Sequence, residues 1–138
     1  MKKIFTIFIV LLLVACVKYT RPAPEISTVN FDKNGGTTTI LIFGNASFTE
    51  NDTMNKYEHE IEYDDGMTKS STMKCGWVTF KLQFYYDNNI HFGDPKLIIT
   101  TEPNDTGKKR TFKLGLVNVM DMGDSRGEAT ITVTQEGE

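Results

Sequence analysis

The stretch WVTFKLQFYY, residues 77–86, is the part of the chain that decides the expected fold. Apolar and polar side chains alternate along it, which is the period of a β-strand with one buried face. The even positions would face a core: Val78, Phe80, Leu82, Phe84 and Tyr86. The odd positions would face the opposite side: Trp77, Thr79, Lys81, Gln83 and Tyr85.

Several other segments show similar strand signals between turn residues. They are 26–31, 37–43, 56–63, 96–101, 110–118 and 128–134, with loops expected at 44–55 and 87–94. Asp65-Gly66 would close a hairpin after 56–63, in which Tyr57, His59, Ile61 and Tyr63 share one face. Seven or eight short strands without helical periodicity predict an all-β fold, an antiparallel β-sandwich.

The first 15 residues have the three-part plan of an export signal. Lys2 and Lys3 precede an apolar run of about 11 residues, which is too short for a membrane core that needs roughly 20. The next feature, Leu13-Val14-Ala15-Cys16, resembles the lipobox of bacterial lipoproteins. In that family the peptide is cut before the cysteine, which then carries fatty acyl chains such as palmitate. An ordinary signal peptide with a chance cysteine is the alternative.

These features divide the chain into three expected parts. Residues 1–15 would be the signal peptide, 16–25 the lipidated N-terminus and an extended tether, and 26–138 one domain. Two or more acyl chains anchor a protein stably, whereas one binds only marginally. We therefore expect the mature protein to be held at a membrane through Cys16.

Charge and cysteine content narrow the expected partners. Without the signal, 123 residues carry 13 Lys and Arg against 18 Asp and Glu, a net charge of −5. No basic run exceeds Lys108-Lys109-Arg110, so nucleic acid is not an expected partner. Once Cys16 is lipidated, Cys75 is the remaining thiol, and no intrachain disulfide can form. Cys75 is most simply a small buried hydrophobe.

Three segments carry a family resemblance. They are the opening stretch VNFDKNGGTTTI (29–40), the loop EPNDTGKKR (102–110) and the closing strand ATITVTQEG (129–137). In this order they resemble BACON domains, the Bacteroidetes-associated carbohydrate-binding, often N-terminal domains. The resemblance covers residues 26–137 and implies an immunoglobulin-like β-sandwich, an opening hairpin and a role in carbohydrate binding. The chain departs from the family in having only Trp77 in its middle, with no Ser-Pro or Ser-Gly turn after it, and in residues 57–74, which look like an added or altered hairpin.

Catalytic and metal-binding signatures are weak in this sequence. His59 would lie on an apolar strand face as a core histidine, and no zinc spacing is present. The acidic stretch 121–128 fails the spacing of a calcium loop. Cys75 has no obvious base partner, and no pair of the 18 carboxylates stands out for glycoside hydrolysis. We therefore expect no catalytic residue, no metal site and no cofactor.

The aromatic residues of 77–86 carry the best functional signal. Sugars bind by stacking a C–H face on an aromatic ring while polar groups take the hydroxyls. Trp77, Lys81, Gln83 and Tyr85 share one strand face, so they are the candidate binding residues. A tryptophan early in a central strand of such sandwiches is also often the buried core residue, and this alternative stays open for Trp77.

The expected function is a non-catalytic binding module on a membrane-anchored lipoprotein, with a glycan or glycoprotein as ligand. The alternative is a structural or assembly lipoprotein that holds a partner protein. The expected location is the outer membrane. The five residues after Cys16, VKYTR, lack the acidic run typical of surface export, so the cell surface and the periplasmic face both remain open.

Overall fold

The computed structural model describes residues 22–44, 46–48, 59–63, 68–87, 90–118 and 128–138, and it describes the backbone alone for 59–63, 68, 86–87 and 90–93. The predicted signal peptide, Cys16 and the predicted tether up to residue 21 lie outside these ranges. Within the ranges, no helix has the length and apolar character needed to cross a membrane.

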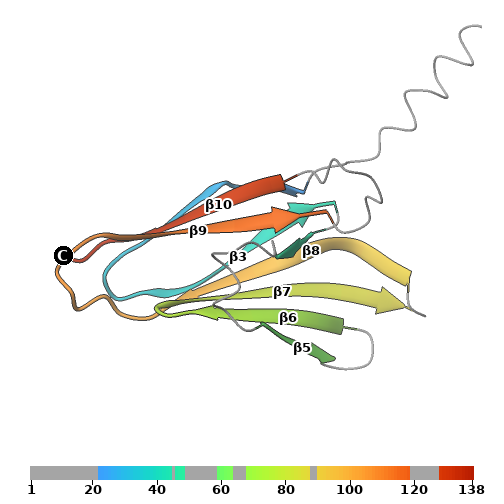
Figure 1. Ribbon diagram of the computed structural model, residues 1–138, viewed down its shortest axis with the longest axis horizontal. Helices are drawn as coiled ribbons and strands as arrows, with labels where there is room; N and C mark the ends of the chain where they lie inside the picture. The colour runs from blue at the N-terminus through green and yellow to red at the C-terminus, as the bar shows by residue number, and fades with distance from the viewer. Residues whose placement is uncertain (1–21, 45, 49–58, 64–67, 88–89, 119–127) are drawn as a thin grey trace, which may run out of the picture.

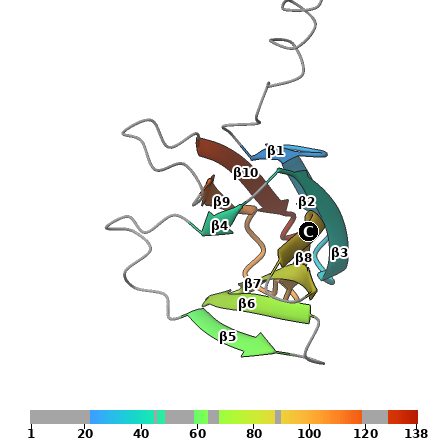
Figure 2. The same ribbon diagram turned by 90° about the vertical axis from the view of Figure 1, so that its right-hand side faces the viewer.

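The described residues form ten β-strands in two sheets. The strands are β1 (Ala23–Pro24), β2 (Thr28–Phe31), β3 (Gly36–Phe43), β4 (Ser47–Phe48), β5 (His59–Tyr63), β6 (Thr68–Cys75), β7 (Val78–Asp87), β8 (Ile90–Thr101), β9 (Arg110–Val117) and β10 (Glu128–Gln135). One sheet has the order β1-β3-β8-β7-β6-β5 and the other β2-β10-β9-β4. The sheets face each other (Figure 1, Figure 2), which confirms the predicted all-β, immunoglobulin-like sandwich.

Two of the ten strands were not expected. Ala23–Pro24 pairs with β3, so the end of the predicted tether belongs to the sheet. Ser47–Phe48 pairs with β9 inside the predicted loop 44–55, and the Phe48 side chain is buried. Strands of two residues are too short to show an alternating pattern, so periodicity does not detect them.

The predicted loop at 87–94 is wrong. Strand β7 runs to Asp87 and β8 starts at Ile90, so most of this segment forms a hairpin. Gln83 faces Lys96, whereas Tyr85 faces Phe92, so the register slips in between. Pro95 lies in this irregular stretch, where a residue without an N–H donor is tolerated inside a sheet. Gly93 and Pro95 are typical turn residues, so the sequence predicted a loop where the strand in fact continues.

The turn at 32–36 connects the two sheets and does not close the hairpin that the family resemblance implied. Strand β2 pairs with β10, and β3 pairs with β8. Gly35 has a φ of 74°, and a Cβ there would clash with the carbonyl oxygen of Thr101. Only glycine fits this crossing, because the turn is left-handed and lies directly against the chain that follows β8.

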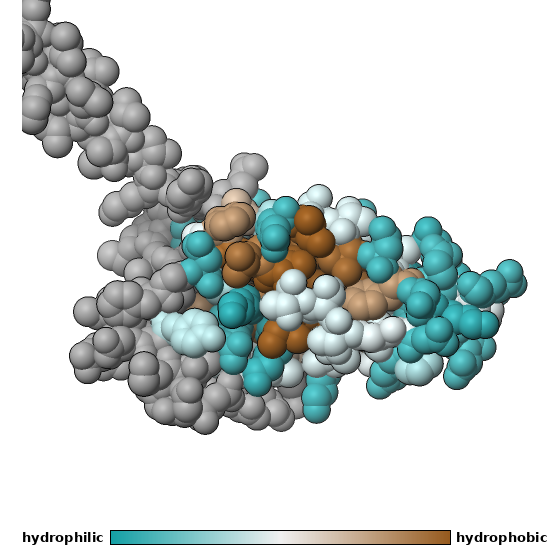
Figure 3. Space-filling model, turned by 180° about the vertical axis from the view of Figure 1, so that it is seen from behind, coloured by the Kyte–Doolittle hydropathy of each residue, from teal (hydrophilic) through white to brown (hydrophobic). Residues whose placement is uncertain are grey.

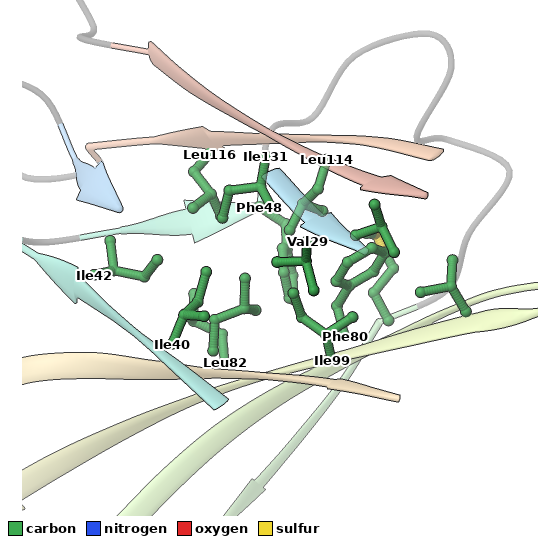
Figure 4. Close-up of a cluster of buried hydrophobic side chains, with 14 of the residues drawn as sticks. Val29, Ile40, Ile42, Phe48, Phe80, Leu82, Ile99, Leu114, Leu116 and Ile131 are labelled. Carbon is green, nitrogen blue, oxygen red and sulfur yellow. The ribbon is translucent and has the colours of Figure 1, made fainter. Parts of the chain in front are cut away.

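The inner faces of the two sheets form one core, part of which is drawn in Figure 4. Its buried members include Val29, Ile40, Ile42, Phe48, Phe80, Leu82, Ile99, Leu114, Leu116 and Ile131. The predicted parity of β7 is confirmed at Val78, Phe80 and Leu82, which are fully buried, and Phe84 packs against the same core. The side chain of Tyr86 lies outside the described residues.

Candidate binding surface

The structure separates the four predicted binding residues. Lys81, Gln83 and Tyr85 lie on β7, whereas Trp77 belongs to the two-residue turn between β6 and β7. Trp77 and Tyr85 are eight residues apart. At a rise of about 3.3 Å per residue, this separation corresponds to roughly 26 Å. One sugar ring therefore cannot contact both aromatic rings.

Trp77 packs inward and is half-buried against the core cluster. The guanidinium carbon of Arg110 lies 4.5 Å from the centroid of its ring. This is a close cation–π contact, and it places the Arg110 side chain over the indole ring. The alternative that assigned Trp77 to the core therefore describes its environment better than an exposed sugar platform does.

A buried glutamine holds Arg110 in place. Gln135 is fully buried, and its Oε1 accepts hydrogen bonds from Arg110 Nε at 2.9 Å and Nη2 at 2.8 Å. Its Nε2 donates to the backbone carbonyls of Asp32 at 3.1 Å and Glu102 at 2.8 Å. Both donors and the acceptor oxygen of this amide are thus engaged, which is how a buried polar group becomes tolerable.

The loop after β8 is fixed by a second buried amide. Asn104 Nδ2 donates to the carbonyl oxygens of Lys108 at 2.8 Å and Glu136 at 3.1 Å. Its Oδ1 accepts hydrogen bonds from the Oγ1 of Thr106 at 2.7 Å and from the backbone N–H of the same residue at 3.3 Å. The three segments that carry the family resemblance therefore meet here. We call Asp32, Trp77, Asn104, Arg110 and Gln135 the locked end.

Sequence reasoning did not identify the locked end. Gln135 follows an alternating run in which it could equally face solvent, and Asn104 lies among turn residues. The turn that carries Trp77 and the strand that carries Arg110 become neighbours only in the folded structure. Strand periodicity does not report such a neighbour.

Among the β7 side chains that the structure describes, Tyr85 is the exposed aromatic one, with 43% of its surface accessible. Lys96 Nζ lies 5.8 Å from the centroid of its ring. Gln83 pairs with Lys96, and Lys81 pairs with Ile98, so these side chains share the outer face of the larger sheet. Lys81 and Gln83 are half-buried, and both already have interaction partners within the protein. We call Lys81, Gln83, Tyr85 and Lys96 the Tyr85 surface.

An apolar strip borders the Tyr85 surface at the edge of the same sheet. Leu41 and Phe43 on β3 are 36% and 42% exposed, and Ile26 just after β1 is 46% exposed. Leu41 is the Cα partner of Lys96, so the strip is continuous with the Tyr85 surface. Figure 3 shows apolar side chains gathered on the side of the molecule seen from behind Figure 1. We call Ile26, Leu41 and Phe43 the apolar strip.

The opposite end of this outer face is polar. Thr37, Thr79 and Thr100 lie side by side on β3, β7 and β8, and the hydroxyls of Thr37 and Thr100 are 3.1 Å apart. The outer face thus runs from hydroxyl groups beside the locked end to rings and aliphatic side chains at the other end. The polarity of the outer face therefore decreases along the strands from the threonine end to the Tyr85 end.

The described titratable groups do not form a reactive centre. Cys75 is buried, and this burial raises the pKa of its thiol to about 11, so the thiol is neutral at pH 7 and a poor nucleophile. Where side chains are described, no three His, Cys, Asp or Glu residues gather closely enough to hold a metal ion. The predictions for the side chain of His59 and for the acidic stretch 121–128 fall almost entirely outside the described part.

The side chains of the Tyr85 surface are suited to contact with a ligand. A rigid ring offers a stacking surface, the Lys96 ammonium donates hydrogen bonds, and the Gln83 amide both donates and accepts them. Such a surface fits a ligand that combines an apolar face with hydroxyl groups. Comparison with known proteins adds no constraint: no family model, no curated protein and no solved structure matched the chain.

Proposed function

We propose that this protein is a lipid-anchored, non-catalytic binding module that recognises carbohydrate through the Tyr85 surface. The observation that carries the proposal is the exposed Tyr85 ring on an open sheet face, beside Lys96 and next to Gln83. Aromatic rings bind the C–H face of a sugar at little entropic cost. The resemblance of the chain to BACON domains supports the same class of ligand.

Anchoring at Cys16 is the second part of the proposal. The lipobox-like sequence supports it, as does the position of β1, which begins seven residues after Cys16. The domain would therefore stand close to the outer membrane. A Cys16→Ala variant should move to the soluble fraction, and protease treatment of intact cells would distinguish the cell surface from the periplasmic face.

Ligand capture tests the first part. The full chain carrying Cys16→Ala would be applied to a glycan array and to immobilised mucin, with and without Tyr85→Ala. Thr100→Ala, on the same outer face at its polar end, is the matched control. We expect Tyr85→Ala to weaken capture about tenfold, as the loss of one stacking ring would, and Thr100→Ala to preserve it. Equal capture by the two variants would remove the Tyr85 surface from the proposal.

A partner protein is the second candidate, and an open strand edge favours it. Strand β4 pairs with β9 at Val117 and Leu116 alone. Among the described strands, none pairs with the remainder of β9 on that side. Exposed strand edges can accept a strand from another chain. Cross-linking in intact cells, with cysteines placed along residues 111–115, would identify such a partner.

A further inference from the structure

We propose that the domain lies against the membrane through the apolar strip, so that Ile26, Leu41 and Phe43 contact lipid. This inference rests on the proposed anchoring at Cys16 and goes beyond it. Anchoring alone fixes the distance from the membrane, whereas a lipid contact also fixes the orientation of the domain and the direction in which the Tyr85 surface faces.

The first argument is the position of the strip beside the point where the chain joins the domain. Ala23 is the Cα partner of Phe43. The backbone N–H of Glu25 donates to the carbonyl oxygen of Leu41 at 2.8 Å, which fixes Ile26 close to the same strand. Figure 2 shows β1 beside β3 at one edge of the sandwich. Among the described residues, the strip is thus the exposed apolar surface beside the point where the proposed anchoring segment enters the domain.

The second argument is the length of the segment between Cys16 and the domain. Pro22 is buried in the domain and lies six residues after Cys16. Six residues span at most about 20 Å when fully extended. Strand β8 has 12 residues and reaches roughly 40 Å at 3.3 Å per residue. This segment is shorter than the domain. It therefore holds the apolar strip close to the membrane, so that the effective concentration of lipid around the strip is high.

The third argument is the chemistry around the strip. Lys96 is the Cα partner of Leu41, so a cation flanks the apolar side chains. The long aliphatic stem of a lysine can lie along apolar surface while its ammonium group stays in water, which suits the boundary between lipid and water. At the other end of the outer face, the exposed Thr37 and Thr100 offer hydroxyl groups instead.

Two carboxylates lie near the strip, and each accepts a backbone hydrogen bond. Glu25 Oε2 accepts from the N–H of Leu41 at 3.1 Å. Asp94 Oδ1 accepts from the N–H of Gly44 at 3.1 Å. These bonds direct the two charged groups toward the backbone, which lessens their opposition to an anionic membrane surface.

The test places a fluorescent probe on the strip. The full lipidated chain with Phe43→Cys would be labelled with an environment-sensitive dye and reconstituted into vesicles of phosphatidylethanolamine and phosphatidylglycerol. Cys75 should not react, because it is 3% exposed and its thiol pKa is about 11. The matched control is Thr37→Cys on the same strand, and Leu41→Cys is a second strip position.

We expect nitroxide-labelled lipids to quench the probe at residues 43 and 41 several-fold more than the probe at residue 37. Equal quenching in vesicles that carry the protein would overturn the lipid contact while leaving the anchor intact. Failure of the protein to float with the vesicles would overturn the anchor and this inference together. If the probe at residue 43 is exposed to water in vesicles but shielded from water in intact cells, the strip would be assigned to a partner protein instead.

Discussion

Two aromatic residues near opposite ends of β7 have different surroundings. Trp77 lies under the guanidinium of Arg110, which is held by a fully buried glutamine. Tyr85 projects from an open sheet face with one lysine beside it. Both residues have odd numbers in the same alternating stretch. The comparison shows that parity assigns a face only within the strand, whereas for a ring in the adjoining turn the residues of the opposite sheet decide whether it is free to bind.

Loss of core packing should give the largest effect, and it sets the scale for both ends. Leu82→Ala is expected to lower the free energy of unfolding by about 2–5 kcal/mol, because Leu82 is fully buried between the sheets. Leu41→Ala, on the outer face, is the matched control and should cost less than about 1 kcal/mol. Denaturant unfolding measures both. A larger cost for Leu41→Ala than for Leu82→Ala would invert the assignment of the faces.

Breaking the locked end should give the next largest effect. Gln135→Leu removes the acceptor of Arg110 and the donor to Asp32, and buried groups that lose a partner cost about 1–3 kcal/mol each. Arg110 Nη2 keeps its hydrogen bonds to the carbonyls of Glu102 and Pro103, so we expect the guanidinium to shift over the indole ring, which the fluorescence of Trp77, the single tryptophan of the chain, should report. Gln83→Leu, at a half-buried site, should cost less. A Gln135→Leu variant with wild-type stability and emission would show that the glutamine does not lock this end.

The protonation of Cys75 offers a finer test of the dry interior beside the Trp77 turn. Burial raises the thiol pKa from 9.0 to about 11, so the folded chain keeps a proton that the unfolded chain loses first. This contribution to stability is fully present below pH 9 and is lost as the pH rises to 11. Relative to Cys75→Ala, the wild-type free energy of unfolding should fall across this window. Parallel pH profiles for the two proteins would place Cys75 in contact with water.

A change on the Tyr85 surface should have the smallest effect on stability. Tyr85→Ala is expected to change the free energy of unfolding by less than about 0.5 kcal/mol, because Tyr85 is among the most exposed large side chains described. The same change should weaken carbohydrate capture about tenfold, which corresponds to roughly 1.4 kcal/mol from a lost stacking ring. Unfolding and array binding are measured on one preparation. A large loss of stability would mean that Tyr85 is structural, as Trp77 is.

Much of the fold could be predicted because it depends on local alternation. The period of two located β3, β7, β9 and β10 and the buried face of β7, since side chains alternate across any strand. The same reasoning missed β4, which has two residues, and the hairpin that continues through Gly93 and Pro95. Glycine and proline are turn residues on average, but a β-bulge accommodates them inside a sheet.

By itself, the sequence determined that the fold is all-β, which side of the central strand is buried, and that Thr79, Lys81, Gln83 and Tyr85 lie on its outer face. Only the tertiary structure decided which aromatic side chains of this stretch are exposed to solvent. Arg110 reaches Trp77 from 33 positions along the chain, and Gln135, 58 positions from Trp77, holds Arg110 there. Strand β3 brings Phe43 to the edge where the chain joins the domain. The exposure of a ring depends on such distant neighbours, because burial is a property of the whole packing and not of the strand that carries the residue.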